Sequence, residues 1–308
     1  MRSFLFGLSA LAACASTAVA GSSPHDRMIQ IHKRANTGSG PTDVEILNYA
    51  LTLENLEYRF YFDNLDRFKT EDFVKSGYAK KVHARIQQIA IQEKTHALFL
   101  KGALGDAAVG RCKYDFSSVT SVKSFLAVAR ILEGVGTAAY LGAAPDITDK
   151  AYLAAAGSVL TVEARHTSYL NEVFGETGFP VPFDTSLDYA QVYSLAAPFI
   201  VPNSCGTSGS LPSAIKAFPA LTVVTKVPRS GHTSAIKFAR VPGVTKYYAA
   251  FLNGGQAVYR EVVQGADGVQ RVRVPEGLDG VTYVVITKSN AEAPNNTNTV
   301  AGPGIMFL

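Results

Sequence analysis

Two short segments each place a carboxylate and an imidazole three residues apart within an apolar helical pattern. They are Glu93-Lys94-Thr95-His96 and Glu163-Ala164-Arg165-His166. Residues three apart share one face of a helix, and around the first segment apolar residues recur at steps of four and three between Val82 and Leu100. A buried carboxylate is costly unless a partner neutralises it. The two segments therefore predict buried groups that need a compensating charge.

Two further predicted helices each contribute one acidic residue to their apolar face. These residues are Glu54, in the helix that follows Thr42, and Glu133, in the helix that follows Thr120. Two helices with one Glu each and two with Glu-x-x-His supply the ligands of a dinuclear carboxylate site in a four-helix bundle. The predicted metal ligands are Glu54, Glu93, His96, Glu133, Glu163 and His166.

The charges of these groups favour a metal site over a network of ion pairs. The apolar faces that carry the four glutamates contain no Lys or Arg, so two divalent ions would cancel the four negative charges. Carboxylate and imidazole ligands suit iron or manganese better than zinc or copper(I). We therefore expect two Fe or two Mn ions, and the residues do not choose between these metals.

An internal repeat relates the two halves of the helical region. A tyrosine follows each single glutamate by seven residues, at Tyr61 and Tyr140. Each tyrosine is either a core aromatic residue or a hydrogen-bond donor to a ligating glutamate. Glu57, one turn beyond Glu54, is an alternative ligand or a neighbour of the site, and the position equivalent to it in the other half is Gly136.

The pattern of residues 42–202 predicts an all-α four-helix bundle with a short fifth helix. Thr42-Asp43-Val44-Glu45 resembles a capping box. The four long helices are expected near 42–68, 78–104, 120–142 and 149–174, with N-caps within Ser117–Thr120 for the third and at Thr148 or Asp149 for the fourth. The fifth helix is expected at 186–196, and the Ser- and Gly-rich residues 203–213 read as a linker.

From residue 214 to residue 308 the periodicity changes from helical to alternating. Asn253-Gly254-Gly255 is typical of a hairpin turn. Short strands separated by turns over about ninety residues indicate a small antiparallel β-sandwich. The expected strands are 221–227, 235–240, 246–252, 257–263, 270–274 and 281–288.

The N-terminus has the features of a secretory signal peptide over residues 1–20. Arg2 precedes an apolar stretch, and Ala18-Val19-Ala20 provides a small-residue cleavage site. Residues 21–41 would be a disordered leader or a pro-segment processed at Lys33-Arg34. We expect a secreted protein, extracellular or associated with the cell wall, with no membrane span. The net charge of +4 is too dispersed to indicate a nucleic-acid partner.

Export affects the interpretation of the cysteines. Cys14 lies in the signal peptide, so the mature chain keeps Cys112 and Cys205, which we expect to form a disulfide in an oxidising compartment. The alternative is two buried free thiols. Asn295-Asn296-Thr297 is a glycosylation sequon, consistent with export.

Residues Thr42 to Pro202 resemble the ferritin-like superfamily, which includes ferritins, rubrerythrins and manganese catalases. The signal peptide, the run from Leu53 to Tyr61 and the appended C-terminal domain are most similar to the secreted ferritin-like proteins of fungi, of the stress-response and late-sexual-development type. The resemblance is specific for the metal site and much weaker for the reaction.

The ligand set leaves positions on the metals for dioxygen or peroxide, so we expect a redox enzyme of catalase-like or ferroxidase-like activity. The alternative is a metal-binding or structural surface protein whose β domain contacts a wall polymer or another protein. Storage of iron in a cage is disfavoured, because a second domain would crowd the assembly of a shell.

Overall fold

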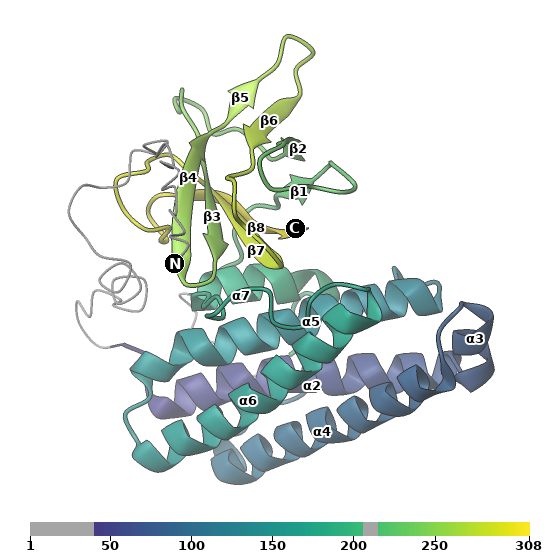
Figure 1. Cartoon of the computed structure of the whole chain (residues 1–308). Coiled ribbons are helices and arrows are strands. Elements are labelled where there is room, and N and C mark those ends of the chain that lie inside the picture. The colour runs from purple at the N-terminus through teal and green to yellow at the C-terminus, as the bar shows by residue number, and fades with distance from the viewer. Residues whose placement is uncertain (1–39, 206–214) are drawn as a thin grey trace, which may run out of the picture.

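The computed structural model describes residues 40–205 and 215–308, and its first part is a bundle of long helices (Figure 1). The predicted signal peptide, Lys33-Arg34 and most of the predicted linker lie outside the described residues. The four long helices are α2 (Asp43–Arg67), α4 (Lys80–Leu104), α5 (Val122–Ala143) and α6 (Lys150–Val173). The predicted fifth helix is α7 (Tyr189–Ala196).

The ends of the helices follow from local hydrogen bonds. The predicted capping box is present at the start of α2, where Thr42 and Glu45 exchange side-chain and backbone hydrogen bonds. The Asp149 carboxylate caps α6 by accepting from the first backbone N–H groups of that helix. The cap of α5 is Ser121, one residue beyond the expected range, because its side chain accepts from the Ser124 N–H.

The bundle is built from two helix pairs. Helix α2 packs mainly against α4, and α5 packs mainly against α6. The segment Val122–Asp146 is long and apolar enough to cross a membrane, but 72% of its most apolar window is buried inside the protein. This burial is what the central helix of a bundle requires, because its apolar residues face neighbouring helices on several sides.

One feature of the helical region differs from the expectations. A short helix, α3 (Thr70–Lys75), follows α2 and was not predicted. It covers His83, which is buried, contacts the ring of Phe73 and shares a hydrogen bond with the Thr70 hydroxyl.

The C-terminal residues form a sandwich, as the alternating pattern predicts. In the described part of the chain the strands make two four-stranded antiparallel sheets, ordered β1-β2-β6-β5 and β4-β3-β7-β8. Gly254 and Gly255, both with positive φ, form the expected turn between β3 and β4. The strands are β1 (Thr222–Val223), β2 (Thr233–Lys237), β3 (Tyr248–Asn253), β4 (Gln256–Glu261), β5 (Val263–Gln264), β6 (Gln270–Arg273), β7 (Val281–Thr287) and β8 (Thr299–Phe307).

Strand β8 was missed because Gly302, Pro303 and Gly304 look like chain breakers in the sequence. The structure accommodates them at an edge, where a proline need not donate a ladder hydrogen bond. A Cβ atom at Gly304 would lie 3.1 Å from the Cγ of Leu221. The glycine therefore permits a close approach of β8 to the residue that precedes β1.

One hydrophobic cluster spans the bundle and the facing sheet, and the sandwich has a second cluster of its own. Leu252 and Val285 from the sheets belong to the same buried cluster as Phe60 and Phe125 from the helices. The Tyr283 hydroxyl donates a 2.8 Å hydrogen bond to the Gly134 carbonyl of α5. The strands therefore pack directly on the side of the bundle formed by α5 and α7 (Figure 1).

The expected disulfide between Cys112 and Cys205 is present, with a sequence separation of 93 residues. It joins the loop before α5 to the segment after α7. Nearby, the Lys113 and Val201 backbones and the Tyr114 and Ile200 bridge bring the same two segments together. The disulfide thus links the two ends of the segment that contains α5, α6 and α7.

The contact between α5 and the segment before α7 depends on Gly142. A Cβ atom at this position would lie 1.9 Å from the Leu187 carbonyl oxygen, so Gly142→Ala should destabilise the protein by about 1–3 kcal/mol. Gly157→Ala in α6 is a matched control, because a Cβ atom at that position would have nothing within 4 Å, and it should be neutral or stabilising by up to about 1 kcal/mol. Thermal unfolding followed by circular dichroism measures both, and equal stability of the two variants would contradict the contact.

Candidate metal centre

The four long helices bring together all six residues predicted as metal ligands. Their ligand atoms form two overlapping groups, in each of which the atoms lie within 4.8 Å of one another. One group contains Glu54, Glu93, His96 and Glu163, and the other contains Glu93, Glu133, Glu163 and His166. The arrangement is therefore a candidate metal site in which Glu93 and Glu163 are common to both groups.

Each imidazole points one nitrogen at several carboxylates. His96 Nδ1 lies 3.4 Å from Glu54 Oε2 and 3.3 Å from an oxygen of both Glu93 and Glu163. His166 Nδ1 lies 2.9 Å from Glu93 Oε1 and 3.0 Å from Glu133 Oε2. Because Glu93 lies near both rings, it occupies the middle of the cluster.

The two tyrosines of the internal repeat donate hydrogen bonds across the bundle. Tyr61 on α2 donates to Glu133 on α5, and Tyr140 on α5 donates to Glu54 on α2, both at 2.5 Å. Each tyrosine thus contacts the glutamate of the other helix rather than the one seven residues before it. The exchange fixes α2 and α5 in antiparallel register and orients both single glutamates.

Glu57 lies beside the two groups and is part of neither. It is buried, and a Cβ atom at Gly136 would come within 3.2 Å of Glu57 Oε1 and 2.6 Å of Glu163 Oε2. Because Gly136 has no side chain, the carboxylates of Glu57 and Glu163 can lie close to the backbone of α5.

Burial and mutual repulsion perturb the titration of these groups. Burial raises the pKa of Glu54 to about 7, and burial together with the charge of Glu163 raises the pKa of Glu57 well above its ordinary value. Burial and the charge of Glu93 likewise raise the pKa of Glu163. Burial alone would raise the pKa of Glu93, but hydrogen bonds from the two imidazoles outweigh this effect and lower it. Burial disfavours the charged form of His166, yet Glu133 and Glu93 raise its pKa to about 10.

The carboxylate and imidazole donors fit a metal cation. Oε2 of Glu163 is buried without a hydrogen-bond partner in the described structure, and Glu163 Oε1 and Glu54 Oε2 have only long contacts with His96 Nδ1, at 3.3 Å and 3.4 Å. Among the described residues no Lys or Arg forms an ion pair with the clustered glutamates. A buried carboxylate oxygen with no donor is costly, and a cation between the two groups would satisfy it.

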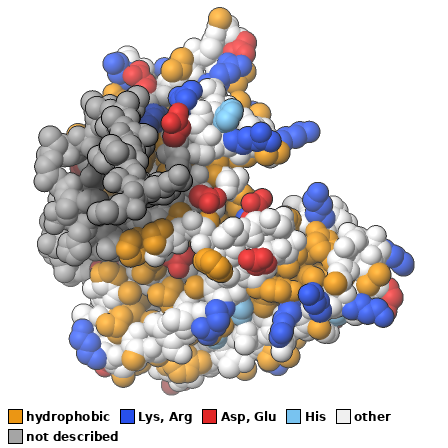
Figure 2. All heavy atoms as spheres, in the orientation of Figure 1, with side chains coloured by type: hydrophobic (Ala, Val, Ile, Leu, Met, Phe, Trp, Pro, Cys, Tyr) orange, Lys and Arg blue, Asp and Glu red, His pale blue; other side chains and the backbone are white. Residues whose placement is uncertain are grey.

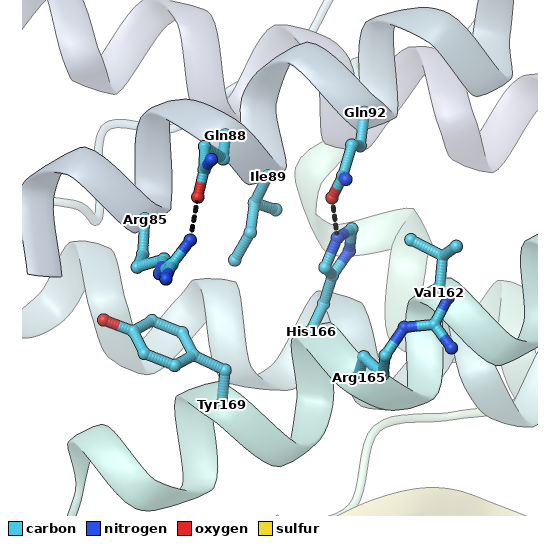
Figure 3. A pocket seen from close by; sticks show the side chains of 8 residues that line it. All are labelled: Arg85, Gln88, Ile89, Gln92, Val162, Arg165, His166 and Tyr169. Carbon is cyan, nitrogen blue, oxygen red and sulfur yellow. Dashed lines mark hydrogen bonds between the residues drawn. The ribbon is translucent and has the colours of Figure 1, made fainter.

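Sequence reasoning missed one residue near the centre. The Gln92 Oε1 atom accepts a 2.6 Å hydrogen bond from His166 Nε2, the ring nitrogen that faces away from the carboxylates (Figure 3). Its position next to Glu93 was visible in the sequence, but the partner is 74 residues away. The Asn295 side chain lies in a turn, where it accepts from Thr297, and its glycosylation stays a prediction.

Comparisons with known proteins agree with this geometry. Residues 42–176 match the model of the ferritin-like domain family. Protein rds1 of Schizosaccharomyces pombe is 29% identical over 208 residues, which cover 68% of this chain. The chain spans 50% of the length of that curated relative. The helical region of this chain is therefore a ferritin-like domain.

Proposed function

We propose that the helical domain binds two iron or two manganese ions and uses them for redox chemistry on dioxygen or peroxide. The observation that carries the proposal is the pair of overlapping four-residue groups that share Glu93 and Glu163. Glu54 with His96 would bind one ion, and Glu133 with His166 the other. The two shared carboxylates would bridge them.

The bound metals would supply a two-electron change shared between adjacent ions, and the protein would control their surroundings. The tyrosine hydroxyls hold Glu54 and Glu133 in fixed orientations. Glu57 borders the space left by Gly136, and burial together with the charge of Glu163 raises its pKa well above its ordinary value. It could therefore hold or release a proton next to the reacting atoms.

Export of the protein to the cell surface or medium is part of the proposal. The pattern of residues 1–20 supports it, and the disulfide between Cys112 and Cys205 is typical of proteins that fold in an oxidising compartment. In this setting peroxide or oxygen would be the small-molecule oxidant.

A second candidate function is a metal-stabilised surface protein with no turnover. It is favoured by the packing of the sandwich on α5, where Tyr283 bonds Gly134, the residue after Glu133. Under this proposal the metals stabilise the bundle, and the sandwich contacts a wall polymer or another protein.

The shared position of Glu93 gives a test of the two metal positions. Elemental analysis should find two ions per chain in the unmodified protein and fewer than one in Glu93→Gln, because both positions lose a ligand. Glu133→Gln should retain the ion in the other position. Glu71→Gln, an exposed change of the same kind, is the control. Equal metal contents in the Glu93 and Glu71 variants would reject the site.

Removal of metal should make stability depend on pH in a defined direction. The folded protein binds more protons than the unfolded chain between about pH 4.5 and 7 at Glu54 and between about pH 6.5 and 10 at His166. The free energy of unfolding of the metal-free protein should therefore fall as pH rises from 5 to 9. Metal displaces these protons, so the rise in Tm on adding Mn(II) should grow with pH. A metal-free protein that becomes more stable over this range would contradict the burial of these groups.

A measurement of catalytic activity distinguishes the two candidate functions. Protein loaded with Fe(II) or Mn(II) should oxidise Fe(II) or consume peroxide, measured by absorbance or an oxygen electrode. Glu93→Gln should lose at least 90% of this rate, with the helical content unchanged. A loaded protein that holds two ions and shows neither activity would support the structural candidate.

A further inference from the structure

The side chain of Gln92 on α4 reaches across to the ring of His166 on α6 (Figure 3). Its Oε1 atom lies 2.6 Å from His166 Nε2. The other ring nitrogen, Nδ1, lies 2.9 Å from Glu93 Oε1 and 3.0 Å from Glu133 Oε2. The imidazole of His166 therefore lies between a neutral hydrogen-bond acceptor on one side and two carboxylates on the other.

This arrangement selects one tautomer of the neutral His166 ring. A neutral imidazole has a proton on one nitrogen and a lone pair on the other. Because the Gln92 oxygen can only accept, the proton lies on Nε2 and the lone pair lies on Nδ1, the nitrogen that faces Glu93 and Glu133. The hydrogen bond of one ring nitrogen decides which nitrogen binds a metal. The ring is thus oriented to bind a cation on the side of the carboxylates.

The opposite side of His166 is a poor place for a cation. Nε2 is bonded to Gln92, and the groove outside it is lined by Arg85 and Arg165 among other residues. Figure 2 shows basic side chains gathered over the face that α4 and α6 present. Like charges repel, so the surroundings of Nε2 and its hydrogen bond both direct a metal to Nδ1.

The other imidazole of the cluster lacks a partner of this kind. Among the described residues none forms a hydrogen bond with His96 Nε2. In the internal repeat, the residue before the glutamate of each Glu-x-x-His segment is Gln92 in α4 and Val162 in α6, and a valine side chain accepts no hydrogen bond. The His96 side chain is 12% exposed, against 6% for His166. The two histidines are therefore held differently.

We propose that Gln92 is a positioning residue for one of the two metal positions. Its hydrogen bond fixes the His166 ring and strengthens the binding of the ion held by Glu133 and His166. The inference rests on the proposed function, since it requires a metal at that position. Loss of such a hydrogen bond typically lowers metal affinity about tenfold to hundredfold. The ion held by Glu54 and His96 should be unaffected, because Gln92 bonds to the other ring.

Titrations with Mn(II), followed by the EPR signal of the free ion, test the proposal one position at a time. Glu54→Gln removes a ligand of the His96 position, and Glu133→Gln removes a ligand of the His166 position. In the Glu54→Gln protein, added Gln92→Leu should weaken binding of the remaining ion by about tenfold or more. In the Glu133→Gln protein the same substitution should leave the affinity unchanged. Gln92→Glu keeps an acceptor and should restore binding in the Glu54→Gln protein.

Gln88→Leu is the matched control, because it removes an exposed glutamine from the same helix and the same groove. Its hydrogen-bond partner is Arg85, which is not a predicted ligand. This variant should bind Mn(II) like the unmodified protein. Circular dichroism of the metal-free proteins checks that both leucine variants keep their helical content.

Nitrogen-15 NMR of protein loaded with Cd(II), a diamagnetic ion, gives a readout that a general loosening of the bundle would not produce. The unmodified protein and Gln88→Leu should show His166 with a proton on Nε2 and the metal on Nδ1. The Nε2 proton should exchange with water faster in Gln92→Leu, because its acceptor is gone.

The outcomes separate this inference from the proposed function. Equal Mn(II) affinities of the Gln92→Leu and Gln88→Leu proteins, or equal weakening in the Glu54→Gln and Glu133→Gln proteins, would overturn the role of Gln92 and leave the metal site intact. Cd(II) bound to His166 through Nε2 would also overturn it. An unmodified protein that binds no Mn(II) would reject the proposed function, and this inference with it.

Discussion

The burial of carboxyl groups in the middle of a helical bundle is the constraint on which the rest of this structure depends. Each charge removed from water costs several kcal/mol unless it gains a close partner. Two imidazoles and two tyrosine hydroxyls lie close to these carboxylates, and Gly136 leaves room for them, but Oε2 of Glu163 still has no donor. The buried carboxyl groups are Glu54, Glu57, Glu93, Glu133 and Glu163.

The helices and the candidate ligands could be predicted because their signals are local. Spacing of three and four residues places Glu93 with His96 on one helical face, whatever the rest of the chain does. The capping box at Thr42 and the turn at Gly254 likewise need only neighbouring residues. A charged residue in an otherwise apolar series indicated that a partner for it lies elsewhere in the fold, since a buried charge with no compensating group is costly.

The features that escaped prediction all join distant parts of the chain. The tyrosine repeat was visible, but the exchange of Tyr61 and Tyr140 between helices depends on their antiparallel register. Strand β8 contains residues that disfavour strands, and only its place at an edge allows them. The hydrogen bond between Gln92 and His166 depends on the relative position of two helices far apart in the sequence. Periodicity reports which side of an element is buried and does not report what covers it.

The hydrogen bond from Tyr283 to the Gly134 carbonyl has a consequence for how this protein can change over evolution. It joins the sandwich to α5 one residue from Glu133, and the apolar residues around it belong to both parts of the chain. A bundle separated from its sandwich would expose an apolar face and lose a restraint on the helix that holds this glutamate. A substitution that weakens this contact in one part would therefore destabilise the other, and exchange of the sandwich for another domain would require a new surface on α5.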